Sequence, residues 1–140
     1  MKEIKFRQAI YLNGIFRSFH YWGFLESYGN IAFVGPITSA SPKDALEHSR
    51  QFTGSLDKQG KEIYEGDITK TLYWSDNREG AICKGKVQWN MDDACFEIEW
   101  LSGTPYGKTD MLDISSNLEI IGNIWENPEI LEEEKCNFTQ

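Results

Sequence analysis

The chain has 140 residues, 40% of them hydrophobic and 14% aromatic, and carries a formal net charge of −8 at pH 7. This length fits one domain with a sizeable core, and the aromatic content excludes a disordered or fibrous protein. No stretch approaches the roughly 18 apolar residues of a membrane helix, and residues 1–9 lack the apolar segment of a secretory signal, so we expect a cytoplasmic protein that does not contact a membrane.

The first predicted element is a β-hairpin. Apolar and polar residues alternate from Ile4 to Leu12, and Asn13-Gly14 is the dipeptide most typical of a two-residue hairpin turn. The strand pattern resumes at residues 15–19.

A short strand and one helix follow. Residues 31–34 are an apolar run that Gly35-Pro36 closes, which favours a buried strand. Ser41 offers an N-cap hydroxyl, and Pro42 suits the first position of a helix. We therefore expect a short helix over residues 42–50.

The rest of the chain predicts short strands joined by tight turns, the pattern of a small barrel or sandwich. In the segment 94–101, Phe96, Ile98 and Trp100 alternate with other residues and are expected to face the core, with Cys95 on the solvent side. Gly85 is expected to mark a β-bulge. The expected strands cover residues 63–64, 68–74, 81–89, 94–101 and 118–125.

The residues that commonly carry catalysis form no familiar arrangement here. Cys83, Cys95 and Cys136 contain no C-x-x-C pair, and only two histidines accompany them, so we expect reduced thiols, no metal site and no other cofactor. No P-loop, dinucleotide-binding or nucleophile-elbow motif is present either. The sequence therefore predicts a protein that is not an enzyme.

Acidic residues crowd the segment 57–67, which contains Asp57, Tyr64, Glu65 and Asp67. Clustered carboxylates can bind a divalent ion, but the spacing is not that of a calcium loop. Their first expected role is to accept hydrogen bonds from turn amides beside nearby glycines. We keep these four residues as candidate contacts for a ligand or a partner.

Six aromatic residues fall within residues 16–28, too many to be buried by one face of a strand. Exposed aromatic residues beside arginine are typical of protein interfaces, and also of platforms on which single-stranded nucleic acid stacks. Alternatively, they fill a thin core. The candidate binding residues of this segment and its neighbouring strand are Arg7, Arg17, Tyr21 and Trp22.

Charge is unevenly distributed along the chain. Residues 1–25 carry four basic residues and one acid, whereas residues 92–140 carry two basic residues and twelve acids. Unlike ends favour head-to-tail contact between copies. The acidic third could also imitate DNA, while a uniformly basic face for phosphates is absent from most of the chain.

Four segments are distinctive when taken together in order: residues 4–9 (IKFRQA), 51–68 (QFTGSLDKQGKEIYEGDI), 85–89 (GKVQW) and 118–131 (LEIIGNIWENPEIL). They resemble the YopX family, which is found in bacterial phages and prophages, and the second segment is the most specific. Two departures are Ile10, in place of a frequent aromatic residue, and Ser55, which interrupts a usual Thr-Gly-Leu order.

The resemblance implies one YopX-like domain of mainly β structure with small α content. Residues 1–50 would form a hairpin and helix lobe, residues 51–128 an SH3-like β-barrel, and residues 129–140 an acidic tail. The resemblance also implies self-association, and it implies no particular activity.

These observations predict a phage-encoded, non-enzymatic accessory protein in the cytoplasm of the host cell. We expect it to bind an unknown phage or host protein and to form a homo-oligomer through its aromatic N-terminal segment. The first alternative is a nucleic-acid-binding protein of phage replication or expression, an idea that rests on fold analogy. A further alternative is an acidic DNA mimic that inhibits a host enzyme.

Overall fold

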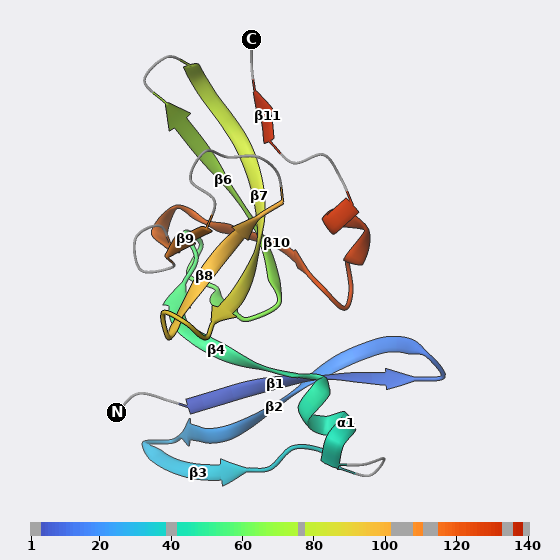
Figure 1. The fold of residues 1–140 in the computed structure, drawn as a ribbon. Helices are drawn as coiled ribbons and strands as arrows, with labels where there is room; N and C mark the ends of the chain where they lie inside the picture. The colour runs from blue at the N-terminus through green and yellow to red at the C-terminus, as the bar shows by residue number, and fades with distance from the viewer. Residues whose placement is uncertain are drawn as a thin grey trace. The chain divides into compact units, whose positions relative to one another are not determined.

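The computed structural model describes residues 4–38, 42–75, 78–101, 108–110, 115–132 and 136–138. It is mainly β, as the sequence predicts, and its strands form two antiparallel sheets. The chain divides into two compact units, residues 1–54 and residues 55–140, which we call the N-terminal and C-terminal units (Figure 1). None of the described helices is long and apolar enough to cross a membrane.

The N-terminal unit contains a sheet whose strands are neighbours in the order β3-β2-β1-β4. The predicted hairpin is confirmed: Asn13 and Gly14 have φ values of 53° and 76°, the left-handed conformation that a two-residue turn of this type requires. A second turn of the same length, at Tyr28-Gly29, joins β2 to β3. The strands are β1 (Ile4–Leu12), β2 (Ile15–Ser27), β3 (Asn30–Val34) and β4 (Ser49–Leu56).

The helix α1 (Pro42–Glu47) and residues 35–38 are tied to the centre of one face of this sheet. The side-chain amide of Gln8 donates to the carbonyl of Ile37 at 2.9 Å and accepts from its N–H at 2.8 Å. The Ser49 hydroxyl donates to the Ala45 carbonyl at 2.6 Å. The helix is shorter than expected because the chain enters β4 at Ser49, opposite Gln8.

The strand at residues 31–34 is present, but the prediction that it is buried is wrong. Ala32, Phe33 and Val34 are exposed. The physical reason is that β3 lies at the end of the sheet, where the described residues provide no further strand beside it. An apolar run therefore does not indicate burial when its strand is at a sheet edge.

The C-terminal unit contains a second sheet of order β10-β6-β7-β8-β9, with β11 paired to β7. The described part of this sheet is open, because no pairing between β9 and β10 closes it into a barrel. Before it comes β5 (Glu62–Tyr64), next to β4 in the first sheet. The remaining elements are β6 (Asp67–Ser75), β7 (Arg78–Asn90), β8 (Cys95–Trp100), β9 (Lys108–Asp110), β10 (Glu119–Asn123), β11 (Cys136–Phe138), η1 (Ser115–Asn117) and η2 (Pro128–Glu132).

The core of the C-terminal unit confirms the alternation predicted for β8. Ile98 is fully buried with Ile63, Val87 and Leu118, while Phe96 and Trp100 pack against them. Burying a side chain of this size contributes about 1.5–3 kcal/mol each.

Two local predictions in this unit are wrong. Gly85 does not mark a bulge: it lies in regular register opposite Thr69 and Trp100. Cys83 is completely buried and disulfide-bonded, contrary to the expected reduced thiols, and the backbone register places Cys136 opposite it. Within the predicted acidic tail, β11 therefore pairs with the sheet.

We predict that Gly85→Ala lowers the free energy of unfolding by about 1–3 kcal/mol, the usual cost of an extra group in a packed core. A Cβ at this position would collide with the Ile98 side chain and come within 3.1 Å of the Trp100 ring. Urea unfolding followed by tryptophan fluorescence measures the change. Gly35→Ala is the control, because its Cβ meets only Phe33, at an ordinary 3.7 Å; equal stability of the two variants would contradict this packing.

Candidate functional site

Asp57, one of the candidate contacts, is held inside the structure by backbone amides. One carboxylate oxygen accepts hydrogen bonds from the N–H of Gln59 at 2.8 Å and of Lys61 at 2.9 Å, and the other accepts from Ile120 at 3.1 Å. The residue is 5% exposed. It therefore connects the turn before β5 to β10 and has a structural role.

These contacts control the ionisation of Asp57. Burial of the carboxyl group raises its pKa, but the hydrogen bonds from Ile120, Lys61 and Gln59, helped by the charge of Lys61, outweigh burial and hold the pKa below its ordinary value of 3.8. The carboxylate is thus the form that the fold requires.

The turn of Tyr64, Glu65, Gly66 and Asp67 is also held internally. Asp67 is almost fully buried and accepts a hydrogen bond from the Tyr64 N–H at 2.8 Å. Gly66 has φ of 91°, donates to the Val87 carbonyl at 2.9 Å, and would place a Cβ 3.2 Å from the Trp125 ring. Only Glu65 is partly exposed, so the turn offers little surface to a ligand.

Arg7 and Trp22, expected in a binding surface, are packed within the N-terminal unit. The Arg7 guanidinium lies 4.5 Å from the centroid of the Phe19 ring, and Arg7 is buried. Trp22 stacks on Phe6 at 4.4 Å and donates from Nε1 to the Ser49 hydroxyl at 3.0 Å. Both side chains therefore hold β1, β2 and β4 together.

Arg17 and Tyr21 are the two sequence-predicted binding residues that are exposed. Tyr21 lies opposite Arg7 in the β1–β2 ladder, and Arg17 lies where the register of that ladder shifts. The structure thus places the eight candidates in several environments and does not gather them into one site. The residues that it describes contain no group of three histidines, cysteines or acids suited to a metal ion.

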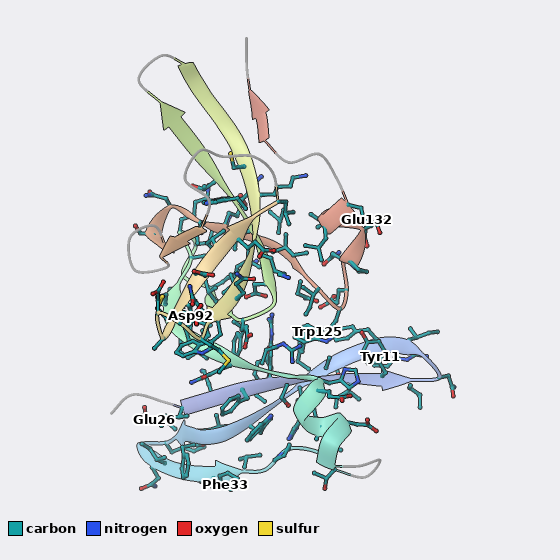
Figure 2. The ribbon with its side chains drawn as sticks, viewed as in Figure 1. Tyr11, Glu26, Phe33, Asp92, Trp125 and Glu132 are labelled. Atoms are coloured by element: carbon teal, nitrogen blue, oxygen red, sulfur yellow. The ribbon has the colours of Figure 1, made fainter. Side chains whose placement is uncertain are left out.

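The strongest surface feature was not predicted: it is a row of apolar side chains across three strands. Ile4 is opposite Phe24, and Phe24 is opposite Phe33. Their exposed fractions are 52%, 50% and 60%, and the two phenylalanine rings are 5.3 Å apart. We call these three residues the apolar row; Phe33 lies on β3 (Figure 2).

One sequence signal could have identified part of this row. Residues equally distant from a two-residue turn lie opposite each other in a hairpin, and Phe24 and Phe33 are equally distant from Tyr28-Gly29. Ile4 lies on β1, outside the β2–β3 hairpin, so the same reasoning does not predict its position opposite Phe24.

Other exposed apolar side chains accompany the apolar row among the described residues of the N-terminal unit. Among the described residues, the buried apolar residues of the N-terminal unit are Ala9 and Ala45, whereas the hydrophobic core cluster lies in the C-terminal unit. Leu56, Trp89 and Met91 are the exposed large apolar residues among those described in the C-terminal unit. Those of the N-terminal unit are Ile4, Tyr11, Leu12, Ile15, Tyr21, Phe24, Tyr28, Phe33, Val34 and Ile37.

Comparison with known families gives one match. A family model described as YopX protein matches residues 24–132, from near the C-terminal end of β2 to the end of η2. A search among curated proteins found no significant match. The matched range includes Phe24 and Phe33 as well as the turns around Asp57 and Gly66.

We predict that Asp57→Asn lowers the free energy of unfolding by about 1–3 kcal/mol at pH 7, because it weakens three buried hydrogen bonds to a carboxylate. Asp92→Asn, at an exposed position, is the matched control. Urea unfolding at a series of pH values measures both.

The contribution of Asp57 to the free energy of unfolding is expected to fall as the pH is lowered. Because folding lowers the pKa of Asp57, its contribution to stability is fully present above the unfolded value near 3.8 and is lost as the pH falls through the folded pKa. The difference between wild type and Asp57→Asn is therefore expected to shrink below about pH 4. A difference that is unchanged or larger there would contradict the assigned role.

Proposed function

The chain belongs to the YopX family, and we propose that it is a phage-encoded, non-enzymatic accessory protein that acts by binding another protein of phage or host. We further propose that residues 51–128 form an SH3-like barrel, that the protein works in the host cytoplasm, and that the N-terminal unit is its binding part. The observation that carries the proposal is the exposed apolar row with the other apolar side chains of this unit.

Exposed apolar residues are common singly, but a contiguous group marks an interaction site more often than chance. Phe24 and Phe33 contact each other and lie in register with Ile4, so the three form one continuous surface. Large aromatic side chains dominate the energetics of protein interfaces because they bury much area with few rotatable bonds. This surface therefore fits a protein partner.

The mainly structural roles of the turn residues support the same proposal. Asp57 and Asp67 use their carboxylates to accept backbone hydrogen bonds, and Gly66 is covered by Trp125. These contacts stabilise the turns of the C-terminal unit. The hydrogen bonds also leave the two carboxylates little capacity for acid–base chemistry. Binding through the N-terminal unit therefore fits this structure better than catalysis at the acidic turns.

Nucleic-acid binding is the second candidate, and one observation favours it: Arg17 and Tyr21 are both exposed on β2. A cation and an aromatic ring on one strand can support a stacked base. Against it, Arg7 is buried over Phe19, and Lys5 lies over the Phe52 ring at 5.0 Å. The net charge of −8 also disfavours binding to phosphates.

Affinity co-purification from phage-induced host cells, with and without nuclease, tests the proposal. We predict that a protein partner remains after nuclease treatment and is lost with Phe24→Lys. Leu56→Lys is the matched control, because Leu56 is 49% exposed, close to the 50% of Phe24, but lies at the end of β4 and outside the apolar row.

Recovery of nucleic acid with every partner lost on nuclease treatment would contradict the proposal. Charge reversal at Arg17 would then be expected to weaken that recovery, in agreement with the second candidate. Retention of the protein partner by Phe24→Lys would instead show that the apolar row is not the binding surface.

A further inference from the structure

Among the residues that the structure describes, the edge of strand β3 has none of the usual protection against pairing with another chain. It lies at the end of its sheet, and its sequence from Asn30 to Val34 contains no charge and no proline. Natural sheets commonly protect such edges with lysine, proline, a bulge or a covering element. The β2–β3 ladder runs without a bulge from Gly23 to Ser27. The edge is therefore suited to accept a further strand.

The hairpin geometry identifies the backbone groups that face this edge. The two-residue turn makes Ser27 and Asn30 the closing pair, which is hydrogen-bonded in turns of this type. Because hydrogen-bonded and non-hydrogen-bonded pairs alternate in an antiparallel ladder, Ala32 also bonds toward β2. The N–H and carbonyl groups of Ile31 and Phe33 consequently point away from β2, toward the edge.

We propose that two copies of this chain associate by antiparallel pairing of β3 with β3, with the two-fold axis at Ala32. This inference rests on the proposed function, since it names one partner of the N-terminal unit. In this register all five residues of the strand pair, and Ile31 of each copy is opposite Phe33 of the other. The outward groups of Ile31 and Phe33 then form two hydrogen-bonded pairs, as an antiparallel ladder requires.

Side chains on the strand are compatible with this register. Phe33 is opposite Phe24 within its own copy, so Ile31 of the second copy extends the apolar row on the same face. On the other face, Ala32 meets Ala32, and small side chains allow the two strands to approach. Each copy uses the same residues, so the contact is isologous and closes as a dimer.

The distribution of charge between the two units leaves only weak electrostatic repulsion at the proposed contact between N-terminal units. Residues 1–54 carry six basic and four acidic residues, a net +2, whereas residues 55–140 carry eight basic and eighteen acidic residues, a net −10. The repulsion expected between two copies of a −8 chain therefore comes from the C-terminal unit. The paired strands themselves contribute no charge.

The area available fits a weak dimer. A phenylalanine side chain can bury about 150–250 Å², so Phe24 and Phe33, at 50% and 60% exposure, together offer about 200 Å² per copy. With Ile4, Val34 and the strand backbone, the surface remains below the roughly 800 Å² per partner of a standard interface. The dimer is thus expected to depend on protein concentration.

Sedimentation velocity over a range of concentrations tests the dimer. We expect a reversible monomer–dimer equilibrium that Phe33→Lys weakens by about tenfold or more, because a charge would enter an apolar contact. Ile15→Lys is the matched control: Ile15 is 56% exposed, near the 60% of Phe33, but lies at the other hairpin turn. It is expected to leave the equilibrium within about twofold of wild type.

A cysteine cross-link tests the register and does not require the edge to be disrupted. Ala32 and its symmetry mate would form a non-hydrogen-bonded pair with Cα atoms about 4.5 Å apart, within disulfide range. In a Cys95→Ser background, Ala32→Cys is expected to give a covalent dimer on oxidation. Val34→Cys is the control, because its mate would lie four residues along the strand, about 13 Å away.

Each result has a defined meaning. A monomeric wild type, or a dimer that neither weakens with Phe33→Lys nor cross-links through Ala32→Cys, overturns the inference. If a monomeric chain still captures a protein partner through Phe24, the proposed function survives without the dimer. If the wild-type chain neither self-associates nor captures a protein partner, both the dimer and the proposed function are overturned.

Discussion

Part of one sheet face in the N-terminal unit has exposed apolar side chains and no covering element among the described residues. Residues 35–38 and the six-residue helix α1 are bonded to the centre of one face, through Gln8 and Ser49. The end that carries Phe24 and Phe33 has no such cover among the described residues. Burial of apolar area is favourable by about 25 cal/mol per Å². Covering this surface with another protein therefore lowers the free energy of the system. The binding proposal depends on this one constraint.

The described residues of the C-terminal unit form a hydrophobic core and a hydrogen-bond network of their own. Ile63, Val87, Ile98 and Leu118 form a core, and the Asp57 carboxylate joins the turn before β5 to β10 with hydrogen bonds from both. The conspicuous acidic turns of the sequence therefore stabilise the fold. Carboxylates that already accept hydrogen bonds from the backbone are poor candidates for binding a ligand. The N-terminal unit is therefore the better candidate for the binding surface.

Local patterns predicted much of the fold. Asn13-Gly14 and the alternation of Phe96, Ile98 and Trp100 identified a hairpin and a core strand, since both depend on neighbours in sequence. The errors depend on distant contacts. An apolar run could not show that β3 is an edge strand, and Gly85 is needed because of Ile98 on another strand. Of the candidate site residues, Arg17 and Tyr21 are exposed, and their binding role stays a prediction. The row from Ile4 to Phe33 could not be predicted locally, because it requires the pairing of three strands.

The most direct measurement of the central claim is amide hydrogen exchange, resolved by residue with NMR, at low and high protein concentration. The account predicts that the amides of Ile31 and Phe33, which face the edge of β3, exchange quickly in dilute protein and become protected as concentration rises. The Ala32 amide, directed toward β2, serves as an internal reference with protection at both concentrations. Exchange at Ile31 and Phe33 that does not change with concentration would contradict the pairing of β3 with β3.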